Sequence, residues 1–535
     1  MLASIQLLLW PLFAFVIYKI VSAIATTYRH AQAANKHGCK PPPTFPTQDP
    51  LGIIDVVRLI QSNNAGRLPE FLKERLDLVS RQEGRSVLTF QTHIVRNWLL
   101  WTVDPKNIQA LLATQFKDFE LGPIRFGTFS PLLGNGIFSS DGKQWEHSRA
   151  LLRPQFVRDQ VSDLGLEERH VQNMLQALPV KSDGWTETID LQPLNFNLTI
   201  DSASEFLLGE SVNCQLSALA GKADSLDAGG KANADFVAAF EKSQDMIAKA
   251  FRLNDWYSLA ITKEFRATSK VCHDYIDRIV NKELSEHSEK RLEAGEHEKY
   301  IFLEKLAGAT QDPIEIRDQV LSILSLTSQI AGRDTTASLL GFLFLMLAEH
   351  QDVLCKLRET VIEEFGTYKR TDKITFLSLK SCQYLQWCMN ETLRLFPTVP
   401  INSRRSVKDT TIPRGGGPDG LSPLFVPKGT EVNYSVYAMH RNKDLWGPDA
   451  DKFQPERWNG KKPGFEYLPF NGGPRICLGQ QFALTEAGYV TVRLLQRFDR
   501  FDGSAMEGLP HDWYLTLTGR PKYGVKLRMH AANED

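Results

Sequence analysis

The chain has 535 residues, with 62 Lys and Arg against 63 Asp and Glu, and its formal net charge is −1. This balance argues against nucleic-acid binding, because a protein that neutralises phosphates needs a clear surplus of basic side chains. The hydrophobic share of 42% and the charged share of 23% exclude a disordered chain and allow a large buried core.

The N terminus predicts a membrane anchor over residues 1–28. Residues 2–25 are almost wholly apolar, with Lys19 as their only charged side chain, and a helix needs about 20 apolar residues to cross a bilayer. A cleaved signal peptide is the alternative, because residues 23–25 have the small-x-small form of a cleavage site. The length of the apolar run and the lack of a basic residue before it favour the anchor.

Residues 29–50 predict a basic, proline-rich hinge. Arg29, Lys36 and Lys40 precede the first acidic residue, and this bias places the rest of the chain on the cytosolic side of the membrane. The prolines within residues 40–46 fix φ and favour a stiff extended spacer.

Residues 51–535 predict a single domain, since no internal repeat and no second long apolar run follow the hinge. Its first part has strand-like runs at residues 87–90 and 98–103, which are rich in β-branched and aromatic side chains. Helical patterns dominate residues 141–396, and short strands and turns follow. The fold class predicted is mainly α with small β-sheets (α+β).

A long apolar stretch over residues 313–349 predicts a helix through the core. Residues 331–336 (AGRDTT) place polar side chains inside it, which is costly unless they bind something, and Gly332 lets the helix open beside a ligand. A kinked helix with a self-satisfied threonine is the alternative. The polar residues 221–232 predict a surface loop, and residues 478–498 predict the last helix.

The seven cysteines include no C-x-x-C pair and are odd in number, which disfavours a disulfide framework or a structural zinc site. Six of them are most simply reduced, buried thiols of a cytosolic fold. Cys477 differs because it lies just before the last helix, where unpaired N–H groups and the helix dipole lower a thiol pKa and favour a metal ligand. Gly473 and Gly479 allow a flat cofactor to approach the backbone, and Arg475 offers a cation to a carboxylate.

Residues 470–479 match F-x-x-G-x-R-x-C-x-G, which resembles the haem-binding loop of the cytochrome P-450 superfamily, the haem-thiolate monooxygenases. Four further features agree with this resemblance and follow the order that the family has. They are the tryptophan and arginine of residues 145–149, the polar residues 331–336, residues 391–394 together with 453–458, and Arg404. The resemblance implies the cytochrome P-450 fold, with one haem domain behind an N-terminal membrane anchor.

The resemblance also implies a role for each matching residue. Haem b would take the Cys477 thiolate as its axial ligand, and Asp334 and Thr335 would deliver protons to iron-bound dioxygen. The residues expected around the haem and its carboxylates are Trp145, Arg149, Arg404, Phe470, Gly473, Arg475 and Gly479, with Arg405 as the alternative to Arg404. Glu391, Arg394 and Arg457 would form a structural network beneath the haem loop, and His440 is interpreted as structural.

The implied activity is insertion of one oxygen atom of O2 into a C–H bond of a lipophilic substrate. Residues 331–337, 413–420 and 470–487 look most like the fungal n-alkane and fatty-acid hydroxylase branch, so we expect a long aliphatic substrate. Oxidation of a polyketide or another secondary metabolite is the alternative, because substrate contacts lie in variable loops. A haem-thiolate isomerase or peroxide-cleaving enzyme needs no acid–alcohol pair, so that pair disfavours it.

The resemblance implies partners and a location too. The chain has no nucleotide-binding glycine loop of its own, so electrons would come from NADPH–cytochrome reductase, with a cytochrome b-type protein as a second donor. The expected location is the endoplasmic reticulum membrane, crossed once, with the haem domain in the cytosol and no nucleic acid bound.

Overall fold

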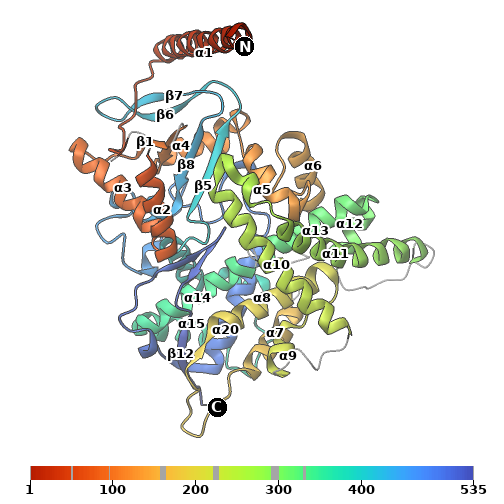
Figure 1. Ribbon diagram of the computed structural model, residues 1–535. Coiled ribbons are helices and arrows are strands. Elements are labelled where there is room, and N and C mark those ends of the chain that lie inside the picture. Colours follow the sequence, from red (N-terminus) through yellow and green to blue (C-terminus); the bar gives the residue numbers. More distant parts are fainter. Residues whose placement is uncertain are drawn as a thin grey trace. The chain divides into compact units, whose positions relative to one another are not determined.

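The computed structural model of the chain describes residues 2–47, 49, 52–94, 97–156, 164–220, 228–290, 301–328 and 333–533 (Figure 1). The chain divides into two compact units. The first comprises Met1–Arg58, Leu72–Glu120 and Ser403–Ser435. The second comprises Leu59–Phe71, Leu121–Asn402 and Val436–Asp535.

The first unit is built on a five-stranded sheet with the order β1-β2-β8-β5-β3. These strands are β1 (Thr89–Ile94), β2 (Asn97–Thr102), β3 (Phe119–Glu120), β5 (Ile401–Ser406) and β8 (Glu431–Ser435). β1 and β2 pair antiparallel, with Thr89 opposite Thr102, whereas β2 and β8 pair parallel, with Leu99 opposite Glu431. The strands predicted at 87–90 and 98–103 are therefore confirmed with slightly different ends.

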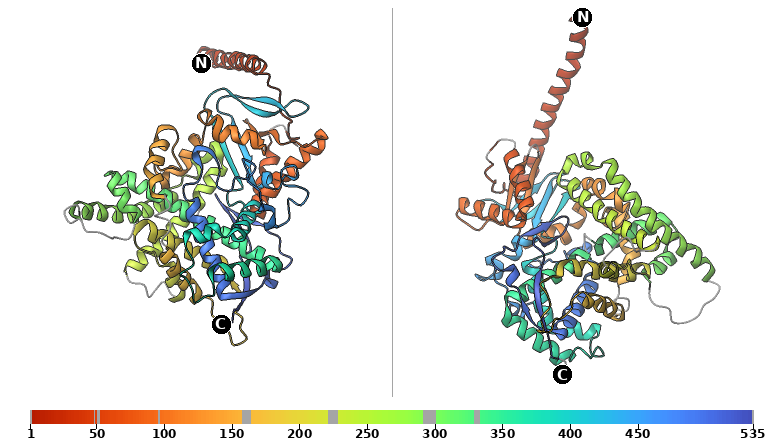
Figure 2. Two further views of the ribbon diagram at one scale, coloured as in Figure 1. Left: turned by 180° about the vertical axis from the view of Figure 1, so that it is seen from behind. Right: turned by 60° about the horizontal axis from the view of Figure 1, so that its bottom comes forward.

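The helices of this unit include α1 (Leu2–Lys36), which is one continuous helix (Figure 2). α4 (Pro105–Gln109) begins after Asp104, whose carboxylate accepts a hydrogen bond from the Lys106 N–H at 2.8 Å. α2 (Ile53–Ala65) and α3 (Leu68–Glu83) contribute residues to both units. A separate antiparallel hairpin is formed by β6 (Thr410–Gly416) and β7 (Ser422–Val426).

The proline segment, residues 40–46, is hydrogen-bonded into the first unit. The Lys40 N–H donates to the Pro423 carbonyl at 3.0 Å, and the Gln91 N–H donates to Pro43 at 2.9 Å. The Phe45 N–H returns a bond to Gln91 at 2.8 Å, and its ring is buried. These residues therefore lie against β1 and the hairpin instead of forming a free spacer.

The second unit is mainly helical, which confirms the predicted fold class. Its helices are α5 (Pro123–Leu133), α6 (Gly142–Leu152), α7 (Leu164–Gln176), α8 (Leu191–Leu208), α9 (Cys214–Ala220), α10 (Ala228–Arg252), α11 (Lys263–Lys290), α12 (Phe302–Ala309), α13 (Pro313–Ser328), α14 (Arg333–Glu349), α15 (Gln351–Phe365), α16 (Phe376–Ser381), α17 (Gln383–Leu395), α18 (Val436–His440), α19 (Lys443–Trp446) and α20 (Gln480–Arg497). Its short strands are β4 (Ile189–Asp190), β9 (Phe498–Asp502), β10 (Trp513–Leu515), β11 (Gly519–Pro521) and β12 (Lys526–Ala531).

α14 is the central element of this unit. Its apolar side chains point in all directions and are buried, as expected for a helix inside a core. It packs against α8, α17, α20 and β11. Figure 1 shows α8 and α20 beside it. Residues 313–349, predicted as one helix, appear as α13 and α14, and residues 329–332 between them lie outside the described residues.

The loop predicted at residues 221–232 is wrong at its end, because residues 228–232 belong to α10. Polar composition suggested a loop, but Ala228 opens a helix whose later residues Phe236 and Phe240 are buried, and that burial stabilises the helix back to its start. Residues 221–227 lie outside the described residues.

Among the residues that the structure describes, no single helix has the length and apolar composition of a membrane span. One bent pair, Thr335–Glu349 with Gln351–Phe365, meets that test together, with an angle of 113° between its helices. The N-terminal anchor stays a prediction.

Candidate active site

The loop before α20 presents the Cys477 thiol. A tight turn at Gly473–Arg475 folds the chain back, and the Cys477 N–H donates to the Phe470 carbonyl at 3.0 Å. Gly473 has φ +67°, a conformation that glycine adopts without strain. Phe470 packs against the main hydrophobic core, which holds the base of the loop in place.

The thiol of Cys477 differs from the sequence-based expectation in its acidity. The residue is only partly buried as a whole, but the packed loop desolvates the sulfur and raises the pKa of Cys477 to about 11. The Gly479 N–H and the Arg149 cation lower this pKa, but by less. The expected lowering by the helix end is therefore wrong, because the cost of burying a thiolate outweighs the dipole. The sulfur needs a bound metal cation to be a thiolate at neutral pH.

Three of the predicted haem-contacting side chains gather beside this loop. The Arg149 Nη1 donates to the Ile476 carbonyl at 3.1 Å. Trp145 is buried one helical turn before it on α6, with the Arg149 guanidinium 5.7 Å and the Arg475 guanidinium 4.3 Å from its ring centre. The second unit thus holds two cations and an indole next to the thiol.

Arg404 belongs to the first unit. It is buried on β5, its Nη1 donates to the Ser403 carbonyl at 2.7 Å, and its guanidinium lies 6.0 Å from the Tyr434 ring centre. Its assignment to the haem carboxylates stays a prediction.

Thr335 has a buried hydroxyl at the start of α14. Its Oγ1 has no hydrogen-bond partner among the described residues. A buried hydroxyl without a partner costs about 1–3 kcal/mol, so this atom is suited to bind water or a ligand. Asp334 lies in α14, but its side chain is outside the described residues.

These residues fit a haem. A thiol, two guanidinium groups and an indole match an iron atom and two carboxylates. Beside them, a Cβ placed on Gly479 would meet no described atom within 4 Å, which leaves the backbone accessible to a flat group.

Glu486 on α20 is a buried acid that the sequence reasoning missed. Burial and the nearby carboxylate of Glu167 raise its pKa well above the usual range of a glutamate, which favours the protonated form. The hydroxyls of Thr336 and Ser202 lie close and act against this shift, and Ser202 also donates to Glu167 at 2.9 Å. The signal that could have identified Glu486 is a glutamate among the apolar residues of the last predicted helix, residues 478–498.

The predicted network of Glu391, Arg394 and Arg457 is brought together in the second unit. Arg394 binds Glu391 through two hydrogen bonds of 2.8 and 2.9 Å, and both side chains are fully buried. The Arg457 Nε adds a bond of 3.3 Å and the Trp458 indole adds one of 3.1 Å to the same carboxylate.

His440 links this network to the loop. Its Nδ1 lies 3.1 Å from the Arg394 carbonyl, and its Nε2 accepts the Leu468 N–H at 2.9 Å. Burial lowers the pKa of His440 to about 3, so the ring is neutral, with the proton on Nδ1. This arrangement agrees with the structural interpretation of His440, because Leu468 stands just before the cysteine loop.

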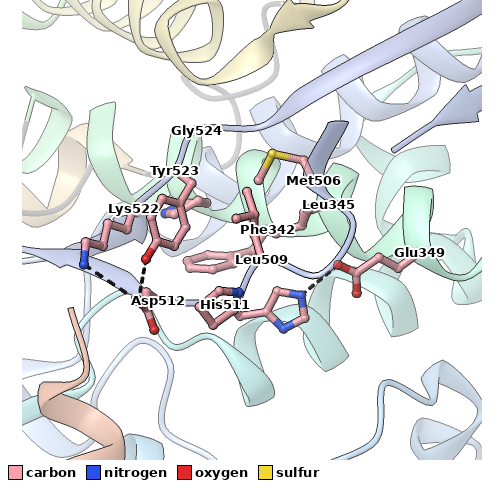
Figure 3. A pocket seen from close by; sticks show the side chains of 12 residues that line it. Phe342, Leu345, Glu349, Met506, Leu509, His511, Asp512, Lys522, Tyr523 and Gly524 are labelled. Atoms are coloured by element: carbon pink, nitrogen blue, oxygen red, sulfur yellow. Dashed lines mark hydrogen bonds and ion pairs between the residues drawn. The ribbon is translucent and has the colours of Figure 1, made fainter. Parts of the chain in front are cut away.

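A small crevice near the C-terminal end of α14 is separate from these residues (Figure 3). Its volume is about 10 Å³, about the space of one water molecule. His511 and Glu349 form a 2.8 Å ion pair at its edge, and the Tyr523 hydroxyl donates to Asp512 at 2.9 Å (Figure 3). None of the predicted site residues lines it.

Comparison with known proteins places these features in a family. The family model for cytochrome P450 matches residues 89–527. The chain is 48% identical to "Cytochrome P450 monooxygenase g430" of Fusarium sp, over 97% of this chain and 90% of that protein. It is 44% identical to "Cytochrome P450 52A13" of Debaryomyces hansenii, over 91% and 92%, and 43% identical to "Cytochrome P450 monooxygenase alt2" of Alternaria solani, over 89% and 88%.

Proposed function

The chain belongs to the cytochrome P450 family and is a haem-dependent monooxygenase, and we propose that its substrate is a long aliphatic chain, hydroxylated at or near its end. Residues 331–337, 413–420 and 470–487 support this choice through their resemblance to the fungal n-alkane and fatty-acid hydroxylase branch. The 44% identity to the Debaryomyces hansenii relative named "Cytochrome P450 52A13" agrees with this choice.

The gathering of Cys477, Arg149, Arg475 and Trp145 in one unit carries the proposed haem site. Cys477 would bind the iron, and the two arginines and the indole would hold the carboxylates. Haem bound in this way supplies the activation of dioxygen at its iron, which a thiolate ligand promotes.

The polar residues at the start of α14 would deliver the protons. The Thr335 hydroxyl has no partner among the described residues, so it can bind a water molecule and donate to a ligand. Asp334 would supply protons from the preceding position. Glu486 is a second buried acid beside Thr336. Its raised pKa favours the protonated form, and it can refill this relay.

P450 enzymes receive electrons from a redox partner and act on lipophilic substrates. The partner that we infer is NADPH–cytochrome reductase, with a cytochrome b-type protein as a second donor. The location that we infer is the endoplasmic reticulum membrane, with α1 as a single-pass anchor and the haem domain in the cytosol. Reconstitution with purified reductase tests the inferred redox partner. NADPH oxidation should depend on the added reductase, and turnover without the reductase would contradict this partner.

The haem ligand is tested by the spectrum of the reduced protein with carbon monoxide. We expect the red-shifted Soret band of thiolate ligation, and we expect Cys477→Ser to abolish it. Cys355→Ser is the matched control and should leave the band unchanged. Cys355 is exposed and Cys214 is only partly buried, so the expectation of six buried thiols is wrong for these two. A thiolate band that survives in Cys477→Ser would refute the ligand.

The substrate class is tested by spin-state titration and product analysis. A fatty acid and an n-alkane of equal length should shift the iron from low to high spin and yield alcohols oxidised at or near the chain end. A polyketide of similar size is the comparison. Tighter binding and faster turnover of the polyketide would favour secondary metabolism instead.

A further inference from the structure

Asp141 stands at the N-cap of α6 but does not cap it. An aspartate in this position usually accepts a hydrogen bond from the N–H groups of the first helical turn. Here the residue has an extended backbone, and its side chain makes no bond to its own helix. Its carboxylate is therefore used elsewhere.

The carboxylate joins two other segments of the second unit. One oxygen accepts the Leu121 N–H at 3.0 Å, and the other accepts the Gly122 N–H at 2.9 Å, so Asp141 fixes the turn that opens α5. The first oxygen also accepts the Arg475 Nη2–H at 2.6 Å. The same Nη2 donates to the Ser140 carbonyl at 3.2 Å.

The environment makes the pair between Asp141 and Arg475 strong and directional. The two side chains are 17% and 9% exposed, so water screens the pair less than a surface ion pair. The Arg475 guanidinium also lies over the buried Trp145 ring, 4.3 Å from its centre. Asp141 and Trp145 together set the direction of a cation that stands two residues before Cys477.

We propose that Asp141 is a positioning residue for the haem: it holds Arg475 in the orientation that binds a haem carboxylate and ties this orientation to the start of α5. The inference rests on the proposed haem site. A guanidinium has five N–H donors, so one arginine can bind two carboxylates at once. Loss of Asp141 would remove this counter-charge and leave Trp145 and the Ser140 carbonyl to orient the cation.

Asp141→Asn, measured as haem-loaded protein, tests the proposal with two readouts besides activity. Haem transfer to an acceptor protein should be about tenfold faster, since a charge-assisted hydrogen bond that orients Arg475 is lost. The midpoint potential of the iron should rise, because removal of a nearby negative charge disfavours the more positive oxidised state. Asp141→Glu should restore the potential, because it keeps the charge.

The control is Asp190→Asn. Asp190 also accepts two backbone N–H groups, from Gln192 and Val525, but it has no bond to the cysteine loop. This variant should lose stability and keep the wild-type potential. Asp141→Ser removes the charge but leaves a hydroxyl that can still accept one backbone N–H, so it separates the charge from the turn if Asp141→Asn does not fold.

Two results would overturn the proposal: folded Asp141→Asn or Asp141→Ser with wild-type haem loss and potential, or additive haem loss in the double variant with Arg475→Gln. Failure of the haem site itself is distinguishable. It would leave the thiolate band intact in Cys477→Ser, whereas failure of the Asp141 proposal leaves that variant without the band and only the Asp141 variants unaltered.

Discussion

The hydroxyl of Thr335 is the clearest single group for proton delivery, because it is buried and has no partner among the described residues. We expect Thr335→Ala to keep the carbon monoxide spectrum and to raise the peroxide released per NADPH consumed. The reason is that, without a hydroxyl at this position to direct protons, dioxygen reduced by the two electrons of NADPH would be released as peroxide instead of being cleaved. Thr335→Ser keeps the hydroxyl and should restore coupling. Equal coupling in wild type and Thr335→Ala would refute the role.

Glu486 gives a pH-dependent prediction. Its pKa in the folded protein is raised by burial, so the folded state keeps the proton while the unfolded state loses it above about pH 4.5. The wild type therefore loses stability as pH rises, by about 1.4 kcal/mol per unit until the folded pKa is reached. Relative to wild type, Glu486→Gln should gain stability as pH rises from about 4.5 toward the folded pKa of Glu486, and it should show no gain below about pH 4.

Denaturant unfolding at both ends of this range measures the difference. Glu359→Gln, an exposed acid on α15, is the control and should follow the wild type at every pH. A constant difference between Glu486→Gln and wild type would show that Glu486 is ionised in the folded protein. Proton relay is tested separately, because Glu486→Gln should slow turnover and leave substrate binding unchanged.

The buried network of Glu391, Arg394 and Arg457 links helix α17 to the segment that precedes the cysteine loop. Glu391 binds two arginines and an indole inside the core, so Glu391→Gln leaves buried cations without their counter-charge. We expect a loss of about 3–5 kcal/mol in unfolding free energy. Haem content should fall too, because the network reaches Leu468 through His440.

The control for this network is an exposed ion pair in the same unit. Lys270 and Asp274 lie 2.7 Å apart on α11 and are largely exposed, so Asp274→Asn should cost less than about 1 kcal/mol. If both variants lose the same small amount, the buried network is not a determinant of stability.

The spacing of residues along the chain predicted those elements that are stabilised by contacts between near neighbours in the sequence. The anchor-length apolar run, β1, β2, α20 and the cysteine loop were all recognisable, because each depends on residues near one another in the chain. The glycines of the β6–β7 hairpin were not explained by the sequence alone. A Cβ on Gly416 would come within 2.4 Å of the Lys40 carbonyl oxygen, and one on Gly420 within 2.6 Å of Arg85 Nη1. Those partners are distant in sequence and become neighbours only in the fold.

The same limit explains the errors at the site. The acidity of Cys477 was misjudged because burial comes from tertiary packing and exceeds the effect of the helix end. The sequence alone does not reveal the role of Asp141, because its bonds to Leu121 and Arg475 join residues far apart in the chain. Glu486 was missed because its partners stand on other helices. The positions of the motif residues could be predicted from the sequence. The acids and the burial that affect their charge and orientation could not.

At the scale of the whole molecule, the bonded proline segment predicts where the chain can be shortened. A chain that begins at residue 37 loses α1 and the 3.6 Å contact between His30 and Asp409, a partly exposed pair worth less than about 1 kcal/mol. A chain that begins at residue 47 also loses the bonds to Pro423 and Gln91 and the Phe45 ring, which lies 3.8 Å below the Arg75 guanidinium.

We therefore expect the chain from residue 37 to keep its carbon monoxide spectrum and to unfold close to the full-length protein in detergent. The chain from residue 47 should be destabilised by about 3 kcal/mol or more, since loss of a buried phenylalanine alone costs that much. Phe45→Ala in the full chain should reproduce most of this loss. If the shorter deletion destabilises the protein as much as the longer one, α1, and not residues 40–45, stabilises the first unit.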